Sequence, residues 1–272
     1  MSNLPHLTSL QNERIKAARA LDRRKERKET GLFLAEGAKV IATARDHGWM
    51  PEILFADPDK ADGGIVGELL TWGRKAGAQC FTVTAKIAEA LSARDNPQPV
   101  IGVFKQRWTE PPTKLRPSDV WVALEEIRDP GNLGTIVRTI DAAGAQGVIL
   151  AGTCCDPYAR EAVRATMGSI FAVPIAAVSQ TSLISFAKSW PGETVGTHLK
   201  GSDDYRRAYN GPVLLTMGSE GPGLSDDVAA AMTTRVKIPM AADTGADSLN
   251  LAVATGLMLY EIKRPTLPKQ DD

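Results

Sequence analysis

Short apolar runs alternate with longer stretches of mixed polarity in the first part of the chain. A short apolar run between polar residues is typical of a buried strand, and apolar residues spaced three or four apart are typical of a helix. Residues 12–29 contain no glycine or proline and predict a first helix. Further strands are predicted over 32–35, 53–56, 80–83 and 100–104, and further helices over 38–46, 65–75 and 85–91. This alternation predicts an α/β domain.

The stretch 108–118 interrupts the alternation. It is polar and contains Pro111, Pro112 and Pro117, which is typical of a semi-rigid linker. We therefore predict a first domain over 1–110, a linker over 111–118 and a second domain over 119–264. Residues 265–272 are predicted to be a disordered tail.

The second half of the chain returns to alternating strands and helices. Strands are predicted over 120–124, 147–150, 194–197, 213–217 and 235–238, and helices over 133–143, 159–167 and 248–263. The middle of the last helix is almost wholly apolar. A helix that is apolar on all sides is buried in a core or at a subunit interface, and the sequence leaves both open.

The formal net charge is zero, with 32 basic and 32 acidic residues. This balance excludes a wholly basic nucleic-acid binder and an acidic disordered chain. The charge is unevenly distributed, because residues 1–110 carry +3 and residues 111–272 carry −3. Residues 12–28 alone carry +5, which indicates either a solvated helix face or a contact to nucleic acid.

Other classes of protein are disfavoured by what the sequence lacks. It has no run of about 20 apolar residues that would predict a transmembrane helix, and no apolar secretory signal at the N-terminus. Its three cysteines, Cys80, Cys154 and Cys155, lack the spacing of a disulfide framework or a zinc site. The histidines are far apart in sequence, so no metal is expected. The default expectation is a cytoplasmic location.

Three blocks of the second half each follow a predicted strand, and the glycines of the second block let the loop backbone approach a ligand closely. The blocks read DPGNLGTIVR (129–138), GSEGPGL (218–224), and IPM (238–240) followed by SLNLAVA (248–254). Asn132 and Ser248 are predicted to cap the helices that follow them. Asn250 would then lie inside an apolar helix, where a buried amide needs hydrogen-bond partners. Asn250 is therefore a candidate site residue.

Together these blocks resemble the three signature motifs of the SpoU (TrmH-type) RNA 2′-O-ribose methyltransferases of the SPOUT superfamily. The resemblance covers about residues 120–263. It implies an α/β catalytic domain with a deep trefoil knot, S-adenosylmethionine (AdoMet) as cofactor, and a homodimer formed through the C-terminal domain. The N-terminal segments 12–16 and 33–37 resemble the L30e-like α/β substrate-binding domain often attached to this family.

The resemblance also implies roles for individual residues. Catalytic roles fall on Arg138, Asn132, Glu220, Ser248 and Asn250. Cofactor contacts fall on Thr216, Met217, Gly218, Gly221, Ile238, Pro239, Met240, Ser248 and Leu249. RNA contacts are predicted at the basic residues Arg14, Lys16, Arg23, Arg24, Lys25, Arg160 and Arg164. Glu220 either holds the Arg138 side chain or takes part in proton transfer.

The substrate is less defined than the reaction. An added RNA-binding domain favours ribosomal RNA over tRNA. Three alternatives remain open. They are a tRNA 2′-O-methyltransferase, a base-modifying relative, and a non-catalytic RNA-binding or ribosome-assembly protein on the same fold. The presence of Asn132, Arg138, Glu220 and Asn250 together favours an enzyme.

Overall fold

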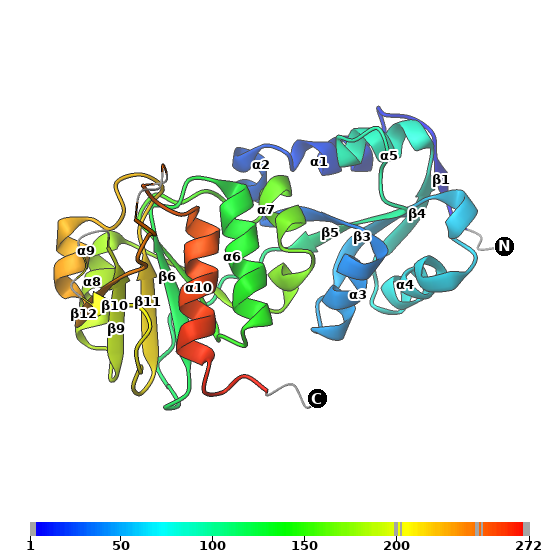
Figure 1. Ribbon diagram of the computed structural model, residues 1–272. Helices are drawn as coiled ribbons and strands as arrows, with labels where there is room; N and C mark the ends of the chain where they lie inside the picture. Colours follow the sequence, from blue (N-terminus) through cyan, green and yellow to red (C-terminus); the bar gives the residue numbers. More distant parts are fainter. Residues whose placement is uncertain (1–3, 199–200, 202, 243–244, 246, 269–272) are drawn as a thin grey trace. The chain divides into compact units, whose positions relative to one another are not determined.

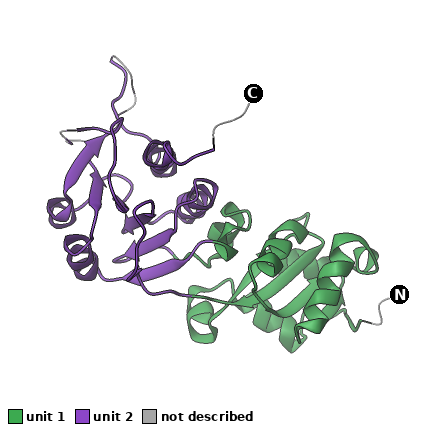
Figure 2. Ribbon diagram, turned by 90° about the horizontal axis from the view of Figure 1, so that it is seen from below, with its two compact units in different colours: residues 1–107, 156–172 green, residues 108–155, 173–272 purple. Residues whose placement is uncertain are grey.

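A computed structural model describes residues 4–198, 201, 203–242, 245 and 247–268, and the chain forms two compact units (Figures 1 and 2). Unit 1 comprises residues 1–107 and 156–172, and unit 2 comprises residues 108–155 and 173–272. The α/β fold predicted from the sequence is confirmed in both units.

Unit 1 is built on a five-stranded mixed sheet in the order β1-β4-β3-β5-β2, in which β5 runs antiparallel to β3 and β2. Buried residues of α1 and α5, including Ile15 and Ile87, pack on one face of this sheet. Its strands are β1 (His6–Leu7), β2 (Leu32–Glu36), β3 (Pro51–Ala56), β4 (Gln79–Val83) and β5 (Val100–Lys105). Its helices are α1 (Glu13–Ala20), α2 (Arg24–Thr30), α3 (Ala38–Asp46), η1 (Pro58–Lys60), α4 (Gly64–Lys75), α5 (Ala85–Ser92), α7 (Arg160–Ala165) and η2 (Ser169–Phe171).

Unit 2 contains a seven-stranded parallel sheet in the order β10-β12-β9-β11-β6-β7-β8. Helices α6 and α10 lie side by side on one face, and α8 and α9 cover the other (Figure 1). The strands are β6 (Val120–Glu125), β7 (Gly147–Ala151), β8 (Ile175–Val178), β9 (Glu193–Thr197), β10 (Asp203–Asp204), β11 (Val213–Met217) and β12 (Thr234–Lys237). The helices are α6 (Pro130–Ala142), α8 (Gln180–Lys188), α9 (Asp226–Ala231) and α10 (Leu251–Lys263).

The predicted helix 12–29 is wrong in one respect, because the structure divides it into α1 and α2. The backbone of Arg23 is extended, with φ −85° and ψ 131°. The guanidinium of Arg27 occupies the break and donates to the carbonyl oxygens of Leu21 and Asp22, both at 2.8 Å. Arg27 also pairs with Asp156 at 2.7 Å. A buried arginine thus satisfies carbonyls that the end of α1 leaves free, and it is withdrawn from the basic surface.

The segment 156–172 belongs to unit 1, although the sequence predicts it within the domain 119–264. Its aromatic residues explain the difference. Tyr158 and Phe171 pack against Phe33, with ring centroids 4.7 and 5.9 Å apart, and the Trp49 indole donates to the Phe171 carbonyl at 2.8 Å. Burial of these rings stabilises the packing of the segment within unit 1, although its neighbours in the sequence belong to unit 2.

Four further elements of unit 2 were not predicted: β8, α8, β10 and α9. Two of them carried a signal, since Ser179 caps α8 and Ser225 caps α9 through their hydroxyl groups. Within the described residues, no helix combines the length and apolar character needed to cross a bilayer.

Candidate active site

The three sequence blocks meet at the carboxyl edge of the unit 2 sheet. Strands β6 and β11 are parallel neighbours, with Leu124 beside Met217, so the loops that follow them leave the sheet together. Strand β9 links β11 to β12, so the loop that begins at Ile238 leaves at the same edge. This edge is where open α/β sheets bind ligands.

A chain of side-chain hydrogen bonds connects the blocks. The Asn132 Nδ2 donates to Glu220 Oε1 at 3.0 Å, and the Asn250 Nδ2 donates to Asn132 Oδ1 at 2.9 Å. The backbone N–H of Arg128 donates to Glu220 Oε2 at 3.3 Å. Hydrogen bonds therefore link Asn132 of the first block to Glu220 of the second and to Asn250 of the third. The spacing of these residues in the sequence does not reveal the links.

The predicted helix caps are wrong. The cap of α6 is Asp129, whose carboxylate accepts from the Asn132 N–H at 2.6 Å, and Asn132 lies inside the first turn. The cap of α10 is Asn250, whose Oδ1 accepts from the N–H groups of Ala252 at 2.9 Å and Val253 at 3.3 Å. Asn250 is exposed and precedes the helix, whereas Ser248 lies two residues before it. Asn250 therefore both caps α10 and holds Asn132.

Glu220 is held as a carboxylate. Its partial burial raises its pKa, but hydrogen bonds from the Asn132 amide and from backbone N–H groups outweigh the burial, so the pKa lies below the ordinary value of 4.5. A carboxylate with a depressed pKa is a weak proton acceptor at neutral pH. The contacts thus favour a role for Glu220 in positioning Asn132.

We expect Glu220→Gln to lower the free energy of unfolding at neutral pH, by less than about 1 kcal/mol because the side chain is exposed. The folded-state pKa is depressed, so the stability from this carboxylate is full above its ordinary pKa of 4.5 and is lost as the pH falls through the lower folded value. Urea unfolding of both proteins between about pH 7 and about pH 3 measures the difference. A difference that stayed constant with pH would contradict the charge state.

Arg138 lies further along α6 and apart from this network. Six residues after Asn132, it is about 9 Å along the helix axis and about a third of a turn around it. Its side chain is exposed and forms no hydrogen bond or ion pair with any residue that the structure describes. Glu220 contacts Asn132, and no contact with Arg138 is present among the described residues, so the predicted holding of Arg138 by Glu220 is not seen.

The residues predicted to bind the cofactor surround the same edge but differ in exposure. Thr216, Met217 and Gly218 are buried, so these three present little side-chain surface. A Cβ on Gly218 would lie 2.0 Å from the Gly223 carbonyl carbon, so only glycine fits where the loop folds back. The remaining predicted positions are exposed or half-buried: Gly221, Ile238, Pro239, Met240, Ser248 and Leu249.

The residues predicted to bind RNA fall into two groups in unit 1. Those of the first group are exposed on or beside α1 and α2: Arg14, Lys16, Arg23, Arg24 and Lys25. Those of the second group, on α7, are turned inward. Arg160 pairs with Asp22 at 2.8 Å, and Arg164 pairs with Glu36 at 2.5 Å. These ion pairs hold both arginines against unit 1.

Two site neighbours were missed by sequence reasoning. Glu126 follows β6 with a φ of 51°, unusual for a residue with a side chain, and its carboxylate pairs with Arg128 at 3.3 Å. The Cys155 thiol is close enough to Glu220 and Asp129 to interact electrostatically with their carboxylates. Burial first, and then Cys154 and these carboxylates, raise the pKa of Cys155 to about 12, so the thiol is protonated and unreactive at neutral pH. The described residues contain no group of three or more side chains suited to a metal ion.

Comparison with known proteins assigns both parts of the chain. The model of the SpoU rRNA Methylase family matches residues 119–260. The model of the MRM3-like substrate binding domain matches residues 12–102. The two matches correspond to the two resemblances that the sequence carries.

The similarity to known proteins extends over almost the whole chain. The 23S rRNA guanosine 2′-O-methyltransferase RlmP of Bacillus subtilis is 28% identical, over 96% of this chain and 100% of that protein. The 23S rRNA uridine 2′-O-methyltransferase of Streptomyces viridochromogenes is 31% identical, over 90% and 86%. The crystal structure of an AdoMet-bound rRNA methyltransferase from Sinorhizobium meliloti is 41% identical, with a TM-score of 0.89 over 97% of this chain and 99% of that one. With a family model that spans half of its length and relatives of this extent, the chain belongs to the SpoU rRNA methylase family.

Proposed function

We propose that this protein transfers a methyl group from AdoMet to a ribose 2′-hydroxyl of RNA, and that the RNA is 23S rRNA. The observation that carries the proposal is the network of Glu220, Asn132 and Asn250, which joins three separate blocks at the ligand-binding edge of the sheet. The names of the relatives from Bacillus subtilis and Streptomyces viridochromogenes support 23S rRNA over tRNA. We also propose a cytoplasmic location, which is the default expectation from the sequence.

The edge of the sheet has features that fit AdoMet. The Thr216 hydroxyl at the end of β11 is buried and has no hydrogen-bond partner among the described residues, so a polar group is missing there. The loop after β11 is rich in glycine, and Pro239 and Met240 in the loop after β12 are exposed. Backbone groups of these loops would hold the cofactor, in a knotted C-terminal chain as the family resemblance implies. When bound, AdoMet supplies an electrophilic methyl group.

Arg138 is proposed to bind the reacting ribose through its charge. A 2′-hydroxyl is a poor nucleophile until it loses its proton. A guanidinium is always protonated, so Arg138 does not take that proton. Its fork of donors suits the neighbouring phosphate and the oxygen on which negative charge develops. The side chain is exposed and has no polar partner among the described residues, which is consistent with a partner supplied by substrate.

The amide network is proposed to orient the ribose. Asn250 is fixed by capping α10, and Asn132 is fixed between Asn250 and Glu220. Rigid polar groups of this kind lower the entropic cost of orienting the bound substrate. Ser248, exposed beside Asn250, is proposed to assist them.

The direct test combines transfer and product identification. The protein is incubated with AdoMet carrying a labelled methyl group and with RNA from a strain that lacks the gene, and the RNA is digested to nucleosides. We expect label in 2′-O-methylribose of 23S rRNA. Label in a base would reject the reaction, label in tRNA would reject the substrate, and absence of AdoMet binding by calorimetry would favour a non-catalytic RNA-binding protein.

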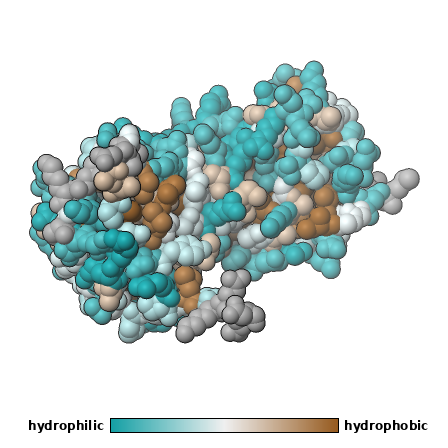
Figure 3. Space-filling model, in the orientation of Figure 1, coloured by the Kyte–Doolittle hydropathy of each residue, from teal (hydrophilic) through white to brown (hydrophobic). Residues whose placement is uncertain are grey.

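A homodimer through the C-terminal domain is also proposed. Along α10 the apolar side chains of Val253, Leu257 and Tyr260 are 52%, 39% and 47% exposed. Their spacing of four and three residues places them on one face of the helix. Apolar surface gathers over α10 on the face shown in Figure 3. An apolar stripe of this kind favours burial against a second copy.

We expect Leu257→Arg to weaken dimerisation at least tenfold, because it would bury a charge in the apolar stripe. Light scattering coupled to size-exclusion chromatography measures the mass. Met50→Arg is the matched control, since Met50 in unit 1 is 56% exposed and lies outside the stripe. A dimer that withstands Leu257→Arg, or a monomeric wild type, would contradict the proposed interface.

A further inference from the structure

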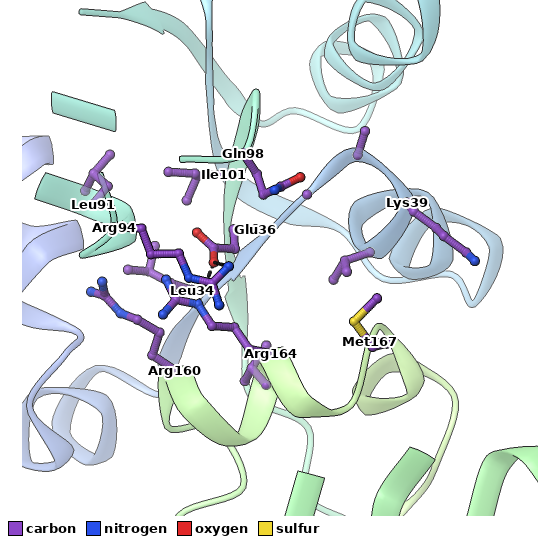
Figure 4. Close-up of a pocket in the computed structure, with 14 residues that line it drawn as sticks. Leu34, Glu36, Lys39, Leu91, Arg94, Gln98, Ile101, Arg160, Arg164 and Met167 are labelled. Atoms are coloured by element: carbon purple, nitrogen blue, oxygen red, sulfur yellow. Dashed lines mark hydrogen bonds and ion pairs between the residues drawn. The ribbon is translucent and has the colours of Figure 1, made fainter. Parts of the chain in front are cut away.

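Unit 1 contains a cavity of about 290 Å³, none of whose lining residues belongs to the candidate active site (Figure 4). Its wall is formed by β2, α3, α5, β5 and α7, all within unit 1. Leu34, Leu91, Ile101 and Val163 make part of the wall apolar. Its volume is near the lower end of ligand pockets, which begin at about 300 Å³.

The charged residues around the cavity are mostly cationic. Lys39, Arg94, Arg160 and Arg164 line it, against the single carboxylate of Glu36. Figure 4 shows Arg94 and Arg164 beside Glu36, while the side chain of Arg160 extends away from that carboxylate. That carboxylate is already used, because it accepts from Arg164 at 2.5 Å and from the Ser92 hydroxyl at 2.6 Å. Arg94 is 3.9 Å from Glu36, and its side chain is 51% exposed. The cavity therefore has a surplus of positive charge.

Arg160 has hydrogen-bond donors that none of the described residues satisfies. Its Nη2 pairs with Asp22 at 2.8 Å, whereas its Nε and Nη1 are buried without a partner among the described residues. Burial lowers the pKa of Arg160, and Asp22 opposes this shift only in part. Buried donors without acceptors are unfavourable and uncommon in folded proteins. An anionic ligand would supply the missing acceptors and charge.

The surroundings favour a polyanion over a free small anion. Asp22, the partner of Arg160, directly precedes the exposed basic residues Arg23, Arg24 and Lys25. Exposed basic side chains thus begin one residue after the partner of Arg160, and two of them, Arg23 and Lys25, also pair with Glu26 and Glu29. Met167 lines the cavity with a 52% exposed side chain, an apolar surface on which a base can pack.

We propose that this cavity binds one nucleotide of the RNA substrate, with its phosphate against Arg94 and Arg160 and its base against the apolar wall. The proposal rests on the proposed function in taking RNA as the ligand. It assigns the α7 arginines, which the sequence predicts as RNA contacts, a place in a nucleotide pocket. It also adds Arg94, which the sequence did not indicate.

The test measures RNA affinity apart from catalysis. Filter binding of in vitro transcribed 23S rRNA is compared at several salt concentrations for the wild type, Arg94→Gln and Arg160→Met. We expect each substitution to weaken RNA binding about tenfold and to reduce the salt dependence by about one phosphate contact. AdoMet affinity, measured by calorimetry, is expected to stay unchanged. Arg74→Gln, at an exposed arginine outside this cavity, is the matched control and should bind RNA as the wild type does.

Arg94→Gln keeps the test decisive if Arg160→Met fails to fold, because Arg94 is half exposed and its ion pair among the described residues, with Glu36, is long at 3.9 Å. Unchanged RNA affinity in folded Arg94→Gln would overturn the pocket. Free uridine monophosphate that bound as tightly as the RNA, and lost its binding in Arg94→Gln, would overturn the RNA assignment in favour of a mononucleotide. If the pocket variants lose RNA affinity while the wild type forms no 2′-O-methyl product, the pocket stands and the proposed function fails.

Discussion

Replacing Arg138 by alanine is expected to reduce 2′-O-methyl transfer by about 100- to 1,000-fold, the range seen when one oxyanion-stabilising donor is removed. The fold should be preserved, because the side chain is exposed and makes no hydrogen bond or ion pair with the described residues. Single-turnover rates at saturating AdoMet and RNA measure the effect on the chemical step. Thermal melting reports on the fold.

Two further variants test whether the effect is specific to the guanidinium of Arg138. Arg138→Lys keeps the charge but loses the planar fork of donors, so an intermediate rate is expected. Arg206→Ala is the matched control, since Arg206 is 62% exposed and its ion pair among the described residues is with the nearby Asp204 on the surface. Turnover at the wild-type rate by folded Arg138→Ala would remove Arg138 from the mechanism.

Gly218→Ala should damage the site through the backbone. The added Cβ would lie 2.0 Å from the Gly223 carbonyl carbon and 2.1 Å from the Leu224 nitrogen, closer than any real contact. Backbone atoms cannot rotate away as a side chain does, so the loop after β11 must move. We expect a loss of about 2 kcal/mol in the free energy of unfolding and at least tenfold weaker AdoMet binding. Thermal melting and calorimetry measure the two effects.

Gly256→Ala is the matched control for this substitution. Gly256 lies inside α10, and its added Cβ would meet only the Thr139 Cγ2 at 3.7 Å, an ordinary contact. Alanine also favours a helix over glycine, so stability should be equal or slightly higher. Equal melting temperatures and equal AdoMet affinities for Gly218→Ala and the wild type would show that the loop tolerates a side chain.

The local pattern of apolar and polar residues was enough to predict most of the helices and strands. The strand 213–217 and the helix 38–46 were predicted to the residue, because the first is a short apolar run, the second has apolar residues three or four apart, and both have clear ends. The end of α1 was missed because it depends on Arg27, which forms its ion pair with a residue more than a hundred positions away. A period in sequence carries no information about such a partner.

The candidate site shows the same division. Motif resemblance identified Asn132, Glu220 and Asn250 one by one. Their hydrogen bonds depend on strand order, which brings together residues 88 and 118 positions apart in the chain. The cap of α10 was misassigned to Ser248 because both residues are good caps, and only the backbone around Asn250 decides between them.

By itself, the sequence determined the α/β class, most of the strands and helices, and the residues of the three blocks, because these follow from local periodicity and residue chemistry. The tertiary structure alone decided that residues 156–172 pack with unit 1, that α7 turns its arginines into a cavity, and that one amide network joins the blocks. Each of these depends on burial and pairing between distant segments, whose free energies no single stretch of sequence contains.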